Sequence, residues 1–352
     1  MIMKKRRLLV FIILLFLIGS SLSACEKNDI PAVTPTIDET EQLGPETDPT
    51  AESSPTSIAL PLQVILWASD GAEPSLVSNM QSLLLTLAEN DELELVLRDS
   101  LSISDLTPAI RIVVAVEPAP NLMSLVESAP HVQFLSVNIP NLTPGANLSV
   151  INATKEDVER QAFMAGYLAA ILTEDYRVGV LVQSGTEFGQ SVIDSFFVGA
   201  RYFCGLCNSR FAPIEYYPKL AEIADSTQLQ SWKMAADLLI AGSVKAVYVQ
   251  PEASSIDLLV YLMDSGVRII SAVSPTEGMQ TDNWIGTLKL DPSFAIQEIW
   301  PKLLNGEGNT RGVLSISLID TEAGWVSEGR KAFFEKTLNE VLNGYIGTAP
   351  IP

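Results

Sequence analysis

The chain has 352 residues, of which 42 are acidic and 22 are basic, so its formal net charge at pH 7 is −20. A negative field of this size opposes binding to nucleic acid and to anionic membrane surfaces, and we expect no nucleic-acid partner. Hydrophobic residues make up 47% of the chain, which is enough for sizeable cores, and the length allows two domains of ordinary size.

Residues 1–25 have the pattern of an export signal. A basic patch, Lys4–Arg7, precedes the apolar run Leu8–Ile18, which is too short to span a bilayer. The segment ends in Leu22-Ser23-Ala24-Cys25, which resembles the bacterial lipobox, whose cysteine receives a lipid. We therefore expect a lipoprotein signal peptide and a lipid anchor at Cys25, on the extracytoplasmic face of the cell membrane. An uncleaved signal anchor and an ordinary cleaved signal are the alternatives.

Residues 26–60 are rich in Pro, Thr, Ser and acidic residues and contain few large apolar side chains. Such a segment cannot bury enough surface to offset its ordering entropy, and its charges repel one another. We interpret it as a disordered acidic tether that lifts a globular part off the membrane. A solvated tail without a spacing role would have the same composition.

From Leu62 onward, short apolar runs alternate with amphipathic segments, which is typical of parallel strands joined by helical crossovers. For residues 62–172 the pattern predicts, in chain order, strand 62–67, helix 74–89, strand 93–97, strand 111–116, helix 121–128, strand 133–137 and helix 155–172. Thr154 is expected to cap the last of these helices, because acidic residues follow it in the first turn.

A second series of strands and helices follows. Its predicted elements are strand 177–182, helix 189–202, strand 211–217, helix 227–241, strand 246–250, helix 254–264, strand 267–272, strand 284–288, helix 293–304, strand 312–318 and helix 327–342. Two doubly wound α/β lobes are the simplest packing of both series, and ligands bind such sheets beyond the carboxyl ends of the strands.

Cys204 and Cys207 are the two cysteines that remain once Cys25 is assigned to lipid. In an exported protein such a close pair favours a local disulfide, with free thiols as the alternative. His131 is the only histidine, so we expect no metal site.

The segment Glu159–Thr173, with the strand Arg177–Leu181 after it, resembles the hallmark of the basic membrane protein family of substrate-binding lipoproteins. Weaker similarities to that family occur in order at Ala129–Phe134, Ser195–Tyr202 and Leu338–Gly347. The family belongs to the type I periplasmic binding proteins and characteristically delivers nucleosides to ABC importers.

The resemblance implies two doubly wound parallel-sheet lobes joined by a hinge of three chain crossings. Lobe one would comprise 61–173 with 284–308, and lobe two 174–283 with 309–352. Within the hallmark helix, Phe163 and Gly166 are expected to pack closely against a sheet rather than to bind ligand.

The sequence departs from the family at the positions that would bind a nucleoside. Asn138 stands where the family has an acidic residue after a strand, and an amide can bind hydroxyls without charge. The family's early loop, which supplies a stacking aromatic, is also missing. Asp70 or Glu73 could replace its polarity and Trp67 its ring, although a turn explains Asp70-Gly71 equally well.

Lys289 approximately matches the family's cleft lysine and is a candidate charged donor. Further candidates follow predicted strands or lie at a chain crossing. The ligand-binding set is Asp70, Asn138, Phe188, Gln250, Ser274, Trp284 and Lys289, and Gln183, Ser184 and Glu252 share the same position after a predicted strand.

These observations and the resemblance predict a membrane-anchored solute-binding lipoprotein that captures a small polar solute, such as a nucleoside, and presents it to an ABC permease. A ligand-sensing or scaffold lipoprotein without a transport role is the alternative. We expect no cofactor and no catalytic residue, because the sequence contains no nucleophile elbow, phosphate loop or histidine cluster.

Overall fold

A computed structural model describes residues 61–208 and 214–350 of the chain. The predicted signal peptide, the lipid anchor at Cys25 and the tether 26–60 lie outside the described residues. None of the described helices is long and apolar enough to cross a membrane.

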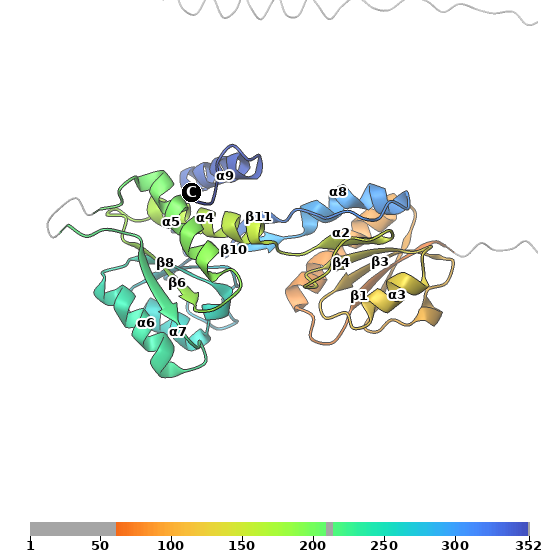
Figure 1. The fold of residues 1–352 in the computed structure, drawn as a ribbon, viewed down its shortest axis with the longest axis horizontal. Coiled ribbons are helices and arrows are strands. Elements are labelled where there is room, and N and C mark those ends of the chain that lie inside the picture. The colour runs from red at the N-terminus through yellow and green to blue at the C-terminus, as the bar shows by residue number, and fades with distance from the viewer. Residues whose placement is uncertain (1–60, 209–213, 351–352) are drawn as a thin grey trace, which may run out of the picture. The chain divides into compact units, whose positions relative to one another are not determined.

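The first sheet has five parallel strands in the order β2-β1-β3-β4-β5. Its central strands are buried along nearly their whole length, as apolar runs in a sheet covered on both faces should be. Helices α2, α3 and α8 pack with this sheet, and Figure 1 shows α8 lying along it. The elements are β1 Gln63–Ala68, α2 Pro74–Asn90, β2 Glu94–Arg98, β3 Ile110–Val116, α3 Leu122–Ser128, β4 Gln133–Val137, β5 Leu148–Ile151 and α8 Ser293–Leu304, with a short 3-10 turn at Ile103–Asp105.

The second sheet has six strands in the order β11-β10-β9-β8-β6-β7, and only the β10–β11 pair is antiparallel. Helices α4, α5, α6, α7 and α9 pack with it. The elements are α4 Lys155–Ile171, β6 Val178–Gln183, α5 Gly189–Cys204, β7 Lys219–Ile223, α6 Leu229–Ala241, β8 Ala246–Val249, α7 Ile256–Asp264, β9 Arg268–Ser271, β10 Trp284–Asp291, β11 Ser315–Ile319 and α9 Glu328–Leu342, with a second 3-10 turn at Pro251–Ala253.

The predicted fold class, α/β with two doubly wound sheets, is confirmed. Most predicted elements recur within a few residues of their expected bounds. The prediction missed β5, whose four residues follow a stretch rich in Asn and Pro and include the buried Ser149.

The strand predicted at 211–217 is wrong in position. The sheet strand is β7, which begins after Pro218 and alternates buried Ala221 and Ile223 with exposed side chains. Proline has no N–H for the ladder, so the pairing with β6 starts at Lys219. Within the described part of 211–217, Tyr216 forms a single bridge to Asn208.

The structure differs from the expected lobe boundaries at α4 and β10. Helix α4 was expected in lobe one, but its buried residues belong to the core of the second sheet. The Gln161 side chain donates to the Leu288 carbonyl oxygen at 2.6 Å and accepts from the Tyr248 hydroxyl at 3.3 Å, which fixes α4 to β10 and β8. Strand β10 was also expected in lobe one, yet it pairs with β9.

The hallmark glycine Gly166 packs against a helix, not against a sheet. A Cβ atom at Gly166 would lie 2.1 Å from the carbonyl oxygen of Phe196, and one at Gly199 would lie 1.9 Å from the carbonyl oxygen of Phe163. Glycine at both positions lets the backbones of α4 and α5 touch. The motif therefore serves the packing of two helices.

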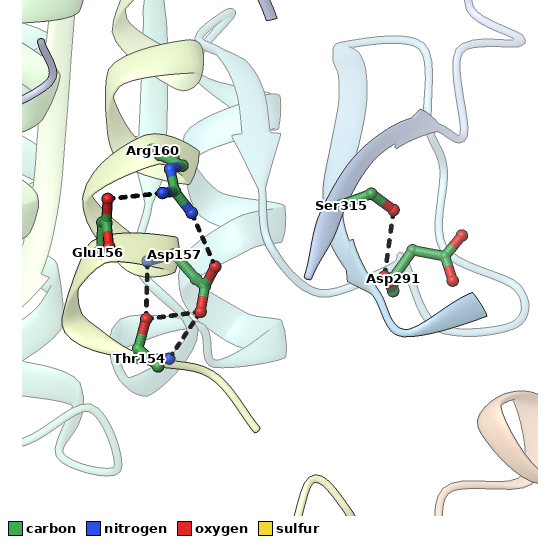
Figure 2. A network of polar contacts seen from close by, with 6 residues as sticks. All are labelled: Thr154, Glu156, Asp157, Arg160, Asp291 and Ser315. Carbon is green, nitrogen blue, oxygen red and sulfur yellow. Dashed lines mark hydrogen bonds and ion pairs between the residues drawn. The ribbon is translucent and has the colours of Figure 1, made fainter. Parts of the chain in front are cut away.

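The chain passes between the two cores after β5, after β10 and before β11, and polar contacts fix its course at these points. Thr154 caps α4 as predicted, since its hydroxyl accepts from the Asp157 N–H at 3.3 Å, while Asp157 accepts from the Thr154 N–H at 3.0 Å. Arg160 then pairs with both Asp157 and Glu156, as Figure 2 shows. Across the other passages, the Ser315 hydroxyl donates to the Asp291 carbonyl oxygen at 3.1 Å (Figure 2).

Cys204 and Cys207 are joined by a disulfide at the end of α5. The bond spans a turn in which Gly205 and Cys207 both have positive φ angles, 67° and 46°. It ties the end of the helix to the loop that follows.

Candidate functional site

A pocket of about 750 Å³ lies at the carboxyl end of the first sheet. Its walls are the segments that follow four neighbouring strands, β1, β2, β3 and β4. Parallel sheets bind ligands at this edge, so the pocket stands where the sequence predicted a site. The lining consists of Trp67, Ser69, Asp70 and residues 99–101, 117–121 and 139–140.

Tight turns bring these segments into place. After β1 the Ala72 N–H donates to the Ser69 carbonyl oxygen at 3.1 Å, and Gly71 has a φ of 98°, which an L side chain rarely adopts. Asn121 has a φ of 65° directly before α3, where asparagine is one of the residues that tolerate a left-handed backbone. The turns leave polar side chains around the pocket.

Three carboxyl groups, those of Asp70, Asp99 and Glu117, are exposed at the pocket. Carboxylates accept hydrogen bonds, so they suit a ligand with hydroxyl or amino donors. The rest of the lining is largely apolar, with three prolines at 118, 120 and 140 and the 2%-exposed Trp67. The Trp67 indole N–H is buried and has no hydrogen-bond partner among the described residues.

Asp70 was predicted from the sequence, and Asp99 and Glu117 were missed. Each of the missed residues directly follows a strand, since β2 ends at Arg98 and β3 ends at Val116. That position is a usable signal, because the carboxyl ends of neighbouring parallel strands meet at one edge. The family resemblance instead points to residues that follow β1 and β4, such as Asp70 and Asn138.

Lys289 is held at the start of α2, by Glu73 directly before the helix and by Ser75 in its first turn. Its ammonium lies 3.3 Å from a Glu73 carboxylate oxygen and 3.1 Å from the Ser75 hydroxyl, and Ser75 also donates to Glu73. The side chains of Lys289 and Glu73 are 25% and 55% exposed, so the pair is partly solvated. Lys289 thus joins β10 to the segment between β1 and α2, beyond Asp70.

Asn138 lies directly after β4, immediately before the pocket residues 139–140. Its φ is 59° and its N–H donates to the Ile151 carbonyl oxygen at 2.8 Å. The half-buried residue therefore turns the chain toward the pocket. It is not itself part of the pocket lining.

Gln250 follows β8 as expected, but both ends of its amide contact protein groups. Its oxygen accepts from the Gln183 N–H at 3.2 Å and its nitrogen donates to the Thr186 hydroxyl at 3.3 Å. The side chain is only 2% exposed. Gln250 therefore holds the loop after β6 in place.

Phe188 and Ser274 lie at the same edge of the second sheet as Gln250. Phe188 is half-buried at the start of α5, and Ser274 is exposed in the loop after β9. Neither residue lines the pocket of the first sheet. Their role as ligand contacts remains a prediction.

Trp284 does not have the predicted position. It starts β10, at the amino edge of the sheet, and is 1% exposed in the second core. Its indole N–H donates to the Thr287 hydroxyl at 3.2 Å. A ring enclosed in this way cannot stack on a ligand, because large apolar side chains are stabilised by burial in the core.

The pocket carboxyl groups do not form a metal cluster. Among residues 61–208 and 214–350, no group of three or more His, Cys, Asp or Glu side chains could hold a metal ion.

No protein-family model matches the chain, and no curated protein sequence matches it. Solved structures do match. An ABC transporter system solute-binding protein from Conexibacter woesei DSM 14684 has 18% identity and a TM-score of 0.55, over 83% of this chain and 98% of that one. A transcriptional activator of the comK gene from Bacillus halodurans has 14% identity and a TM-score of 0.55, over 82% and 100%.

A third match, an ABC transporter system solute-binding protein from Aeropyrum pernix K1, has 11% identity and a TM-score of 0.50, over 82% of this chain and 93% of that one. Identities this low establish similarity of fold. Together with the two parallel-dominated sheets and the chain crossings between their cores, they show that this chain has the fold of the type I periplasmic binding proteins.

Proposed function

We propose that the protein is a membrane-anchored, extracytoplasmic solute-binding lipoprotein of an ABC importer. It captures a small polar solute at the carboxyl edge of the first sheet and presents it to a permease. The observation that carries the proposal is the pocket there, whose lining combines three carboxyl groups with apolar surface. The lipobox-like Leu22–Cys25 supports the anchor, and the two solute-binding proteins of like fold support the class of function.

The lining favours a solute that donates several hydrogen bonds. Asp70, Asp99 and Glu117 can accept from hydroxyl or amino groups, while the prolines of the lining offer apolar surface to a ring. Nucleosides and sugars fit this description. Small anions do not, because the three carboxyl groups would repel them.

A second function is favoured by one comparison. The comK activator of like fold suggests a regulatory binding module, in which occupancy of the pocket is reported to a partner and no solute is transported. Both functions require the pocket to bind, so binding is the first thing to test.

The test is a thermal-shift screen of the full chain, purified in a non-ionic detergent, against nucleosides, nucleobases, sugars and amino acids. A solute at a hundred times its dissociation constant should stabilise the fold by about 2.7 kcal/mol. A shift with a nucleoside or sugar, reduced in Glu117→Gln, supports the proposal. If no solute raises the melting temperature, or if only acidic solutes do, the proposal is contradicted.

A second experiment distinguishes a transport role from a regulatory role. Deletion of the gene should abolish uptake of the radiolabelled solute if the protein serves an importer. Normal uptake with a changed transcriptional response to the solute would favour the regulatory module.

A further inference from the structure

A second pocket, of about 560 Å³, lies at the amino edge of the second sheet. Four basic side chains line it, from Arg177, Lys245, Arg268 and Arg330. Two acidic side chains, from Glu174 and Asp175, also line it, so four positive groups face two negative ones. This is a local excess of positive charge in a chain whose net charge is −20.

The sheet itself gathers three of these cations. Arg177 and Lys245 directly precede β6 and β8, and Arg268 is the first residue of β9. The three strands are neighbours, and their backbones connect the residues: the Lys245 N–H donates to the Arg177 carbonyl oxygen at 2.6 Å, and the Arg268 N–H donates to that of Lys245 at 2.9 Å. The parallel sheet therefore holds three like charges at one edge.

Arg268, which is half-buried, is positioned by uncharged groups. The Arg268 guanidinium donates to the Leu172 carbonyl oxygen at 3.0 Å and lies 4.6 Å from the centre of the Trp325 ring. Burial, followed by the nearby charge of Arg330, lowers the pKa of Arg268, and the Glu174 carboxylate offsets part of this effect. The positive charge of Arg330 therefore opposes that of Arg268, and an anion between them would relieve the repulsion.

Arg330 is placed by the same tryptophan, since its guanidinium donates to the Trp325 carbonyl oxygen at 3.2 Å. Within the described residues, Arg177 is the lining cation with an ion-pair partner, Asp175, at 3.7 Å. Lys245, Arg268 and Arg330 have no carboxylate within ion-pair distance among the described residues. These three cations have donor capacity left for a ligand.

We propose that this pocket binds the phosphate group of a small molecule, held by Arg268, Arg330 and Lys245. Guanidinium forks match the oxygens of phosphate, and an ammonium adds a point charge. A concave wall with an excess of positive charge concentrates the field, so the pocket attracts anions although the net charge of the whole chain is negative. The site is independent of the solute pocket on the first sheet, which is lined by carboxyl groups.

The phosphate group could belong to a soluble metabolite or to a lipid head group. Isothermal titration calorimetry of the full chain in detergent, at constant ionic strength, distinguishes the two sources. The probes are inorganic phosphate and glycerophosphoglycerol, the soluble head group of phosphatidylglycerol. Binding of inorganic phosphate assigns the pocket to soluble phosphates, and binding of glycerophosphoglycerol alone assigns it to the lipid head group.

The test variant is Lys245→Gln with Arg330→Gln, because both side chains are exposed and their replacement leaves the core intact. The control is Lys331→Gln, an exposed cation next to Arg330 that does not line the pocket. We expect affinity at least tenfold weaker in the double variant and unchanged in the control, because each lost contact is charge-assisted. Equal affinity in the double variant and the wild type, or no heat with either probe, would overturn the proposal. Melting curves identify a misfolded double variant, in which case Lys245→Gln alone is titrated.

Discussion

At the scale of single residues, the chemistry of the candidate site depends on where a strand ends. Asp99 and Glu117 each come directly after a parallel strand, and the sheet brings them to one pocket with Asp70. The sequence predicted Asp70, whereas the family resemblance pointed to positions other than Asp99 and Glu117. Its position at a chain crossing made Trp284 a candidate for stacking on a ligand, with core packing as the alternative, and the structure has the ring buried in the core.

The first prediction concerns Glu117. Glu117→Gln keeps the shape of the side chain and removes its charge, so the affinity for a nucleoside or sugar that binds should fall about tenfold or more. Glu117 is exposed, so the melting temperature without solute should stay the same. The matched control is Glu127→Gln on α3, which is also exposed but does not line the pocket. Calorimetric titration of both variants checks this, and equal losses of affinity would count against the site.

The second prediction concerns Lys289 and Glu73. Their ion pair is partly solvated, so a double-mutant cycle with Lys289→Ala and Glu73→Gln should give a coupling energy of about 0.2–1 kcal/mol. Lys289→Ala should lower the melting temperature by only a few degrees, and stabilisation by the solute should persist, because Lys289 does not line the pocket. Thermal unfolding with and without the solute measures both effects, and loss of the solute response in this variant would add Lys289 to the site.

At the scale of elements, the sequence predicts that α4 packs closely at Gly166 but assigns it the wrong partner, a sheet in place of helix α5. The sequence predicted α4, its cap Thr154 and the need for close packing at Gly166, and these follow from spacing and residue size. It could not predict that α5 would supply the partner surface. That contact depends on Gly199, which lies far along the chain, and only the folded topology brings the two glycines together.

The third prediction tests that contact. Gly166→Ala places a methyl group on the backbone of α5, which cannot yield as a flexible side chain does, so the helices must separate. We expect a loss of about 1–3 kcal/mol in the free energy of unfolding, seen as a lower denaturant midpoint. Gly329→Ala is the control, because nothing lies within 4 Å of its Cβ position. A midpoint for Gly166→Ala as high as that of the control would show that α4 and α5 do not touch in this way.

The fourth prediction concerns pH and the turn before α6. A hydrogen bond from the Thr227 hydroxyl, 2.7 Å from the carboxylate, lowers the pKa of Asp225 below its ordinary value of 3.8, and the Thr227 N–H contributes further. A lowered pKa means that the folded state favours the ionised form. The stabilisation is therefore present above the ordinary pKa and is lost as pH falls through the lowered one.

Asp225→Asn should accordingly melt at a lower temperature than the wild type at neutral pH. The difference should disappear once the pH is well below the ordinary carboxyl pKa. Melting curves of both proteins across this range make the comparison, and a difference that is constant with pH would rule out the carboxylate as its source.

At the scale of the whole molecule, alternation of strands and helices was enough to predict two doubly wound sheets, because parallel strands need crossover helices. It was not enough to assign each element to its sheet. Helix α4 and strand β10 lie next to the chain crossings, where sequence neighbours belong to different cores, and only long-range contacts such as that of Gln161 with Leu288 decide their place. The strand expected at 211–217 was misplaced because aromatic residues there outweighed the signal of Pro218.

The central claim is that a donor-rich solute binds at the carboxyl edge of the first sheet. Hydrogen exchange of the full chain, measured by mass spectrometry with and without adenosine, or with the panel solute that gives the largest thermal shift, tests it most directly. The account predicts slower exchange in the segments 69–71, 99–101 and 117–121, which surround the pocket. A stabilising solute that leaves exchange in these segments unchanged would contradict it.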